Sequence, residues 1–323
     1  MGVSQSNAFQ STSIAFKAYA NDVFSHDGRR APQFSMFTAL DSTDRYTVEH
    51  DVMEALPVVR EWVGTRQEPD VIFATVRGVA RTWEKTFSED RKRALSGAAD
   101  GQLLRRLMSW LGSPDMDLDK IATDYLVSNP TGYDGVAVFS ASHPRGPGGG
   151  TQSNTSATAL SGAQHRSVIT SGSGFGDVYG EPFGIQYDTL MVGPALAPLA
   201  RELTGSTRFA AINASGVEAT SAVVTAAEVP SANRLQVFTG GEMNVVVNPR
   251  FIGSSLANKY LYLDTSKSAR PIVAYRFQGG SRVVERMQDT DQSRWAADRY
   301  EWAAEHDLVL VPGAWQVAFF GGP

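Results

Sequence analysis

The spacing of apolar residues predicts a β-hairpin in the first third of the chain. Residues 71–76 (VIFATV) are rich in β-branched and aromatic side chains, and residues 83–87 (WEKTF) alternate between apolar and polar positions. Arg77-Gly78 stands between the two runs, and glycine is favoured in tight turns. We therefore expect a hairpin within residues 46–87, with its turn at Arg77-Gly78.

Residues 88–128 have the spacing of a helix instead. Ser88 is a candidate N-cap, and long apolar side chains recur at helical spacing from Leu103 to Leu111. Gly112-Ser113-Pro114 interrupts this pattern, which then resumes and stops at Asn129-Pro130. The segment predicts either two helices or one long broken helix.

The N-terminal residues 1–45 mix Ser, Asn, Gln and Asp with isolated apolar residues. Apolar side chains between Ala15 and Phe24 predict a short helix, and we expect the rest of the segment to be extended. A polar arm of this kind becomes ordered only by lying on another surface. Two interpretations follow, a disordered terminus or an arm that docks on a neighbouring subunit.

A glycine-rich segment lies in the middle of the chain. Residues 136–139 (VAVF) predict a short buried strand, and residues 145–182 then contain nine glycines and only four charged residues. This composition predicts a long loop, and long loops in compact domains are usually functional or mobile. Beyond it the pattern is α+β, with a helix expected at residues 195–203 and strands at residues 190–192, 235–238, 243–247, 260–263, 271–277, 300–311 and 315–320.

Composition narrows the classes of protein to consider. The 323 residues predict two domains, and 42% hydrophobic with 20% charged residues is ordinary for a globular protein. A net charge of -5 argues against tight wrapping around nucleic acid, because such binding needs dense Lys and Arg. The absence of cysteine excludes disulfides, thiolate zinc sites and cysteine nucleophiles. No apolar run approaches the roughly 18 residues of a membrane span, so we expect no membrane contact and no secretory signal.

A candidate metal site fails on its spacing. Asp115, Asp117 and Asp119 alternate like the ligands of a calcium loop, but Lys120 and Leu126 stand where that loop needs glycine and glutamate. We expect these acids to start a helix instead. The five histidines also lack a metal-ligand spacing and are interpreted as surface or structural residues.

Nucleotide-binding and hydrolase motifs are missing as well. The glycines of residues 172–176 (GSGFG) lack the βαβ context of a dinucleotide fingerprint, so we expect a flexible loop there. Neither a GxxxxGK[ST] loop nor a GxSxG motif occurs. The sequence therefore assigns no catalytic residue, no cofactor and no metal. A basic cluster from Arg91 to Arg106 is either a solvated helix face or a surface that faces nucleic acid.

Several segments occur together in an order that is typical of one protein family. They are Arg60–Arg66 (REWVGTR), Tyr133–Phe139 (YDGVAVF), Ser142–Pro144 (SHP), Asn154 after the glycine run, Leu190–Pro194 (LMVGP), Tyr260–Asp264 (YLYLD), Arg270–Val273 (RPIV), Tyr300–Trp302 (YEW) and Leu308–Pro312 (LVLVP). In this order the chain resembles the major head subunits of Mu-like phages and prophages, over about residues 8–320. That family has the Hong Kong 97-type capsid fold. The joint order carries the resemblance, because no single segment is specific.

The resemblance implies an α+β, Hong Kong 97-type phage capsid fold and a structural subunit that is not an enzyme. It implies a major capsid protein that assembles with itself into pentamers and hexamers, which form an icosahedral shell around double-stranded viral DNA. The further partners that it implies are a portal, scaffolding or decoration proteins, and packaged DNA in weak non-specific contact. The implied location is the virion, after assembly in the host bacterial cytoplasm. The implied parts are an N-terminal arm (1–45), an extended E-loop hairpin (46–87), a peripheral domain with the spine helix and the Gly-rich loop (88–189), an axial domain (190–270) and return strands (271–323).

Candidate subunit contacts follow from the residue types that dominate interfaces, which are aromatic residues and arginine. The aromatic candidates are equally well explained as ordinary core residues. Two rival hypotheses also remain. One is an encapsulin-like nanocompartment shell of the same fold, and the other is a soluble α+β enzyme whose Gly-rich loop at residues 145–182 acts as a lid. The candidate contact residues are Arg60, Glu61, Trp62, Arg66, Phe73 and Trp83.

Overall fold

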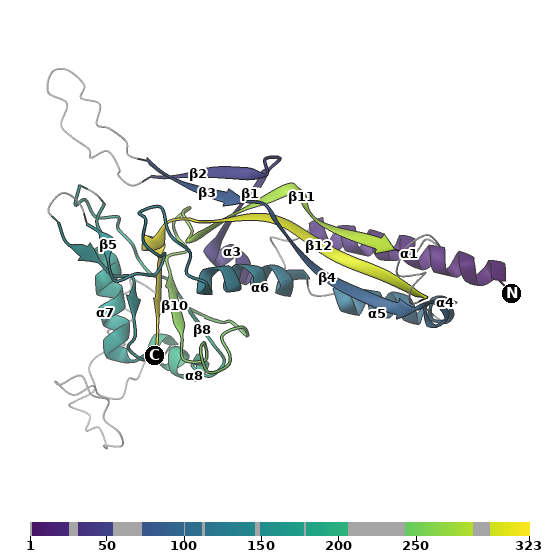
Figure 1. Cartoon of the computed structure of the whole chain (residues 1–323). Helices are drawn as coiled ribbons and strands as arrows, with labels where there is room; N and C mark the ends of the chain where they lie inside the picture. The colour runs from purple at the N-terminus through teal and green to yellow at the C-terminus, as the bar shows by residue number, and fades with distance from the viewer. Residues whose placement is uncertain are drawn as a thin grey trace, which may run out of the picture.

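Two larger β-sheets divide the chain into a long arm and a body (Figure 1). The N-terminus lies at the far end of the arm, and the C-terminus lies in the body (Figure 1). The structure is a computed structural model, and it describes residues 2–25, 32–53, 73–99, 101–111, 114–145, 149–177, 179–205, 243–286 and 298–323.

The arm is built on a four-stranded sheet in the order β1-β11-β12-β4. Strand β1 is parallel to β11, whereas β12 is antiparallel to both of its neighbours. The register of β11 and β12 shifts between Arg276 and Ser281, where Gln278, Gly279 and Gly280 all have positive φ. The bounds of the strands are β1 (Thr38–Thr43), β4 (Arg81–Asp90), β11 (Ile272–Arg286) and β12 (Arg299–Pro312).

Helices α1 (Gly2–Ser25), α4 (Arg91–Ala99) and α5 (Gln102–Leu111) pack on one face of the arm sheet. Side chains alternate along β12, so that Trp302 and its neighbours two positions away face these helices and are buried. Helix α5 contributes Leu103, Leu107 and Leu111. The arm therefore has a hydrophobic core distinct from that of the body.

The N-terminal segment is a helix that packs on its own subunit. The helix predicted between Ala15 and Phe24 is confirmed, whereas the extended conformation predicted for the rest of the arm is wrong for residues 2–14. The ring of Phe9 lies 4.6 Å from that of Tyr300 on β12, measured between centroids. Lys17 Nζ lies 2.7 Å from a carboxylate oxygen of Glu285 on β11. The buried apolar side chains of α1 recur at helical spacing and explain the docking; they are Phe9, Phe16, Ala20, Val23 and Phe24.

The observed hairpin pairs other segments than those expected. Strands β2 (Thr47–Met53) and β3 (Phe73–Val79) form the antiparallel pair, while β4 leaves it and joins the arm sheet beside β12. The predicted turn at Arg77-Gly78 is wrong, because Gly78 lies inside β3. A Cβ at Gly78 would lie 2.4 Å from the side chain of Val311, so the glycine permits close packing of the hairpin on the sheet.

The helical region begins later than predicted. Strand β4 continues through Ser88 to Asp90, whose side chain accepts hydrogen bonds from the backbone N–H groups of Lys92 and Arg93. Asp90, and not Ser88, therefore caps α4. The predicted interruption is confirmed, since α5 ends before α6 (Pro114–Val127), whose first turn holds acidic residues as expected.

The glycine-rich segment contains a helix, so the predicted long loop is wrong for its described part. Helix α7 (Gly162–Ser173) is capped by Ser161, whose hydroxyl accepts a hydrogen bond from the backbone N–H of Gln164. On this helix Gly172 faces Tyr187, and a Cβ there would lie 2.5 Å from the tyrosine ring. The enzyme hypothesis required a mobile lid at residues 145–182, and helix α7 occupies residues 162–173 of that segment. Short strands precede the helix at β5 (His143–Pro144), β6 (Thr151–Gln152) and β7 (Thr155–Ser156).

The predicted strand at residues 136–139 is wrong as well. The segment is a compact turn that forms only an isolated β-bridge, between Thr131 and Ala137. Asn129, which has a φ of 51°, closes it from outside: its side chain donates to the carbonyl oxygen of Phe139 and accepts from the N–H of the same residue. The side chain of one asparagine thus replaces a strand partner.

A five-stranded sheet in the order β7-β13-β10-β8-β9 forms the centre of the body. Its middle strand β10 (Tyr260–Leu263) is buried on both faces, as its continuous apolar run predicts. The predicted strands at residues 190–192, 243–247 and 260–263 and the predicted helix near residues 195–203 are confirmed, whereas residues 235–238 lie outside the described residues. The remaining bounds are α3 (Pro32–Phe37), β8 (Thr189–Val192), α8 (Ala197–Gly205), β9 (Asn244–Val247) and β13 (Ala318–Gly321).

The buried His165 on α7 makes the stability of the body depend on pH. Burial, aided by the charge of Arg166, lowers the pKa of His165 to about 4, below the value of about 6.5 in an unfolded chain. Because the unfolded state binds the proton more readily, this stability is fully present above pH ~6.5 and is lost as the pH falls to about 4. We expect a loss of about 3 kcal/mol across that window. Urea unfolding at several pH values should show a shallower pH dependence for His165→Gln; an equal dependence would contradict the assignment.

Candidate functional site

One face of the β2–β3 hairpin is fixed to the arm sheet, and we call it the inner face. Its Val48 and Val52 are buried, and Val48 packs in one cluster with Val309 of β12. His50 Nδ1 lies 2.7 Å from the hydroxyl oxygen of Tyr275 on β11. Burial lowers the pKa of His50, so the ring is neutral at pH 7. The hairpin is therefore held rigidly at its base.

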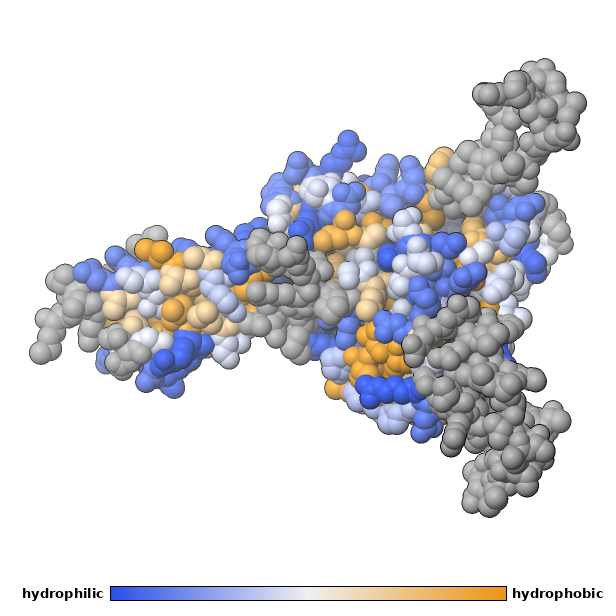
Figure 2. Space-filling model, turned by 180° about the vertical axis from the view of Figure 1, so that it is seen from behind, coloured by the Kyte–Doolittle hydropathy of each residue, from blue (hydrophilic) through white to orange (hydrophobic). Residues whose placement is uncertain are grey.

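The outer face of the hairpin is exposed and partly apolar. Phe73 and Val79 of β3 lie on this face and are 55% and 43% exposed. Glu49 and Arg77 stand opposite each other on the same face. Seen from behind, further hydrophobic patches reach the surface on both the arm and the body (Figure 2). Exposed apolar groups on a rigid strand pair are typical of an interaction surface.

The sequence-predicted contact residues fall into different places. Phe73 lies on the outer face, where it is available to a partner. Trp83 lies on β4 and packs partly buried against the body core, so the hairpin does not carry it. The other predicted contact residues lie outside the described residues, namely Arg60, Glu61, Trp62 and Arg66.

The basic cluster on α4 and α5 is partly neutralised. Glu89 at the end of β4 pairs with Arg93 and with Arg106, at 3.1 Å in both cases. Lys92 and Arg105 remain exposed. A shallow groove beside α5 is lined by Arg105 and Arg106 together with Trp110. The cluster is thus a mixed helix face with a small excess of positive charge.

A buried polar network joins the middle of the chain to its C-terminal segment. His143 is fully buried, and its ring stacks on that of Trp315 with centroids 3.8 Å apart. Its Nδ1 lies 2.5 Å from a carboxylate oxygen of Asp134, and its Nε2 lies 3.1 Å from the side-chain oxygen of Asn154. The amide nitrogen of Asn154 donates to the carbonyl oxygens of residues 138, 315 and 318, which fixes its orientation.

This network is the part of the site that sequence reasoning missed. The YDG, SHP and Asn154 segments were recognised one by one, but nothing in their spacing indicated that their polar side chains meet. Both nitrogens of His143 face side-chain oxygen atoms, one from the Asp134 carboxylate and one from the Asn154 amide. The network has a structural role, since His143 and Asn154 are buried, the side chain of Asp134 is only 8% exposed, and all three are bonded within the subunit.

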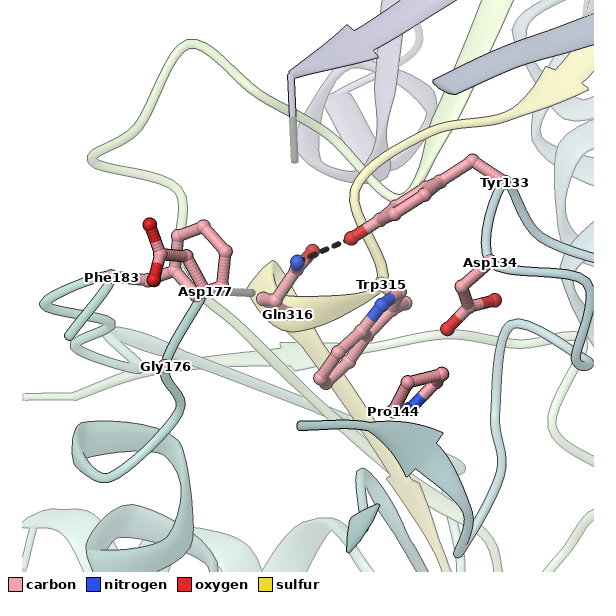
Figure 3. A pocket seen from close by; sticks show the side chains of 8 residues that line it. All are labelled: Tyr133, Asp134, Pro144, Gly176, Asp177, Phe183, Trp315 and Gln316. Atoms are coloured by element: carbon pink, nitrogen blue, oxygen red, sulfur yellow. Dashed lines mark hydrogen bonds between the residues drawn. The ribbon is translucent and has the colours of Figure 1, made fainter. Parts of the chain in front are cut away.

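A cavity of about 220 Å³ lies beside this network. Figure 3 shows Asp134 and Pro144 on one side of Trp315 and Gln316, and Asp177 with Phe183 on the other. The side-chain amide of Gln316 donates to the hydroxyl oxygen of Tyr133 at 2.5 Å, which closes the top of the cavity in this view. The lining thus combines aromatic rings with carboxylates from two separate segments.

The described residues form no group of three His, Asp or Glu side chains that could hold a metal ion. Within those same ranges, no helix is long and apolar enough to cross a membrane. The glycines of residues 172–176 do not form a phosphate loop, because Gly172 belongs to α7 and Gly176 forms a bridge with Pro182.

Comparison with known protein families gives one match. Residues 14–169 match the family described as "Mu-like prophage major head subunit gpT". The match includes α1 from residue 14 onward, the hairpin and the part of α7 up to residue 169, and it ends before the body strands β8–β10. No curated protein sequence matches the chain.

Solved structures from phages resemble most of the chain. The procapsid of bacteriophage JBD30 has a TM-score of 0.50 and 14% identity, covering 97% of this chain and 75% of that one. A structure from Mycobacterium phage Patience has a TM-score of 0.52 and 9% identity, covering 95% and 86%. One from Mycobacterium phage Bobi has a TM-score of 0.50 and 13% identity, covering 90% of each chain. At these identities the likeness concerns the fold.

Proposed function

We propose that the chain is a member of the Mu-like prophage major head subunits, whose family model its residues 14–169 match, and that it builds the phage head shell as pentamers and hexamers of itself. Head subunits are structural proteins, so no reaction is assigned to the chain. The shell would enclose double-stranded DNA, and the protein's place would be the virion.

The observation that carries this proposal is the rigid hairpin with its exposed outer face. A two-stranded ribbon has marginal stability in water on its own, but the inner face anchors this one to the arm sheet through Val48. The outer face then presents Phe73 and Val79 to solvent. In a heterologous contact one surface of a subunit binds a different surface of its neighbour, and such contacts can close into rings.

The parts of the capsid fold can be proposed with revised boundaries. The E-loop would be the β2–β3 hairpin with the residues between its strands, and it would end at β3 because β4 belongs to the arm sheet. The arm sheet with α1, α4 and α5 would be the peripheral domain. The body sheet with α7 and α8 would be the axial domain, which would then begin before residue 162 and not at residue 190.

Partners other than a second copy are proposed from the same family membership. A portal and scaffolding or decoration proteins would meet the assembled shell, and packaged DNA would touch its inner surface weakly. Lys92 and Arg105 are the exposed basic residues that we propose for that DNA contact. Their small number agrees with a weak, non-specific interaction.

Expression of the chain alone, followed by light scattering and negative-stain electron microscopy, tests the proposal. We expect closed shells, or free pentamers and hexamers. A homogeneous monomer or dimer, even with a co-expressed candidate scaffold, would contradict it. The cargo of any shells formed during infection distinguishes a phage head, which holds DNA, from an encapsulin-like compartment, which holds protein.

A further inference from the structure

A cavity of about 410 Å³ lies between the inner face of the hairpin and the arm sheet. Strand β2 contributes His50 and Val52 to its lining, and β11 contributes Val273 and Tyr275. The side chain of His50 connects the two layers, because its Nδ1 lies 2.7 Å from the hydroxyl oxygen of Tyr275. The two rings meet edge to face, with their centroids 6.0 Å apart. His50 is thus a polar contact that holds the inner face against β11.

Two carboxylates and one guanidinium line the same cavity. Asp41 lies on β1 beside Tyr275 in the strand register, and Asp51 follows His50 on β2. Both carboxylates belong to exposed residues, so solvent screens the charge that they present to His50. Arg270, just before β11, donates to the backbone carbonyl oxygens of residues 265, 267 and 269, so its guanidinium is engaged within its own loop.

The other strands around the His50 ring present apolar side chains to it. Strand β3 places Val76 opposite His50, and β12 packs Val309 and Val311 against the hairpin. Burial outweighs the attraction of the two carboxylates and lowers the pKa of His50 below its ordinary value of 6.5. The docked hairpin therefore favours a neutral ring, whereas the ring of an undocked hairpin lies in water and takes up a proton more readily.

We propose that His50 and Tyr275 form a pH-sensitive latch, which holds the hairpin on the arm sheet at neutral pH and releases it in acid. Because the undocked state binds the proton more readily, docking is fully stable above about pH 6.5 and weakens as the pH falls below that value. Release separates the inner face from the sheet that it covers (Figure 1). The latch goes beyond the proposed function, since it acts within one subunit.

Amide hydrogen exchange of the free subunit, corrected for the intrinsic effect of pH on exchange, tests the latch. The protection of the β2 and β3 amides is measured at about pH 7.5 and about pH 5.5, on either side of the ordinary pKa of histidine. We expect the equilibrium constant for opening of the wild-type hairpin to rise by up to about tenfold at the lower pH. That limit is reached when only the open state takes up the proton.

The variant His50→Gln should remove this pH dependence, because glutamine still forms hydrogen bonds but takes up no proton in this range. The matched control is His165→Gln, which removes a buried histidine from the body and should leave the pH dependence of the hairpin as in wild type. Equal protection of the wild-type hairpin at both pH values, or an undiminished pH dependence in His50→Gln, would overturn the latch. The measurement uses unassembled subunits, so a failure of the chain to form shells would remove the proposed function and leave the latch.

Discussion

Replacing Phe16 by alanine should lower the free energy of unfolding of the unassembled subunit by about 3–5 kcal/mol, the usual cost of removing a buried phenylalanine side chain. Phe16 lies on α1, is fully buried, and packs in the arm core with Trp302 and Leu107. Its ring centroid lies 6.3 Å from that of Trp110 on α5. Urea denaturation followed by circular dichroism measures the change.

The matched control is Ile14→Ala on the same helix, because Ile14 is 69% exposed. An exposed substitution should change the free energy of unfolding by no more than about 0.5 kcal/mol. A large difference between the two variants is expected only if α1 is docked on its own subunit. If both variants behave like wild type, the N-terminal helix does not contribute to the subunit, and the original expectation of a free arm returns.

The N-terminal helix shows why local pattern was insufficient there. Its buried residues from Phe9 to Val23 recur at helical spacing, but small polar residues separate them and the apolar stripe is weak. The stripe is buried by packing with Tyr300 and Trp302, which come from the far end of the chain. Tertiary packing, and not propensity, stabilises this helix.

Buried strands were predicted well for the opposite reason. The runs of β8 and β10 are continuously apolar and bounded by polar residues, and a strand with two covered faces needs such a run. The long strand β12 was also predicted within one residue at each end. The prediction of the hairpin turn was wrong because a glycine beside a β-rich run usually indicates a turn. Gly78 instead lies within β3, where a Cβ atom would clash with the side chains of Val309 and Val311.

The candidate site was only partly predictable. Phe73 lies on an exposed strand face, and its role in a subunit contact stays a prediction. The sequence did not indicate that Asp177 is buried, because an acidic residue in a glycine-rich segment is expected to be solvated. Its burial depends on how the turn folds against Phe183 and the C-terminal segment, and sequence spacing contains no information on that contact.

Removing the hairpin tip should abolish shells while leaving a folded subunit. The register of β2 and β3 pairs Met53 with Phe73, so residues 54–72 can be replaced by the turn Asn-Gly, which suits a two-residue antiparallel connection. The inner-face residues Val48 and Val52 are untouched, so the free energy of unfolding should stay within about 0.5 kcal/mol of wild type. The deletion must stop before Phe73, because β3 and β4 belong to the packed structure.

Electron microscopy of the assembled fraction and urea unfolding of the subunit measure the two outcomes separately. A second variant carries a Gly/Ser segment of equal length in place of residues 54–72, which keeps the length and removes Arg60, Glu61, Trp62 and Arg66. Loss of shells in both variants assigns assembly to those side chains. Loss only in the shortened variant assigns it to the reach of the loop, because the spacer alone would then suffice. Normal shells from the shortened variant would contradict the E-loop proposal, and the outer face with Phe73 and Val79 would be the next surface to change.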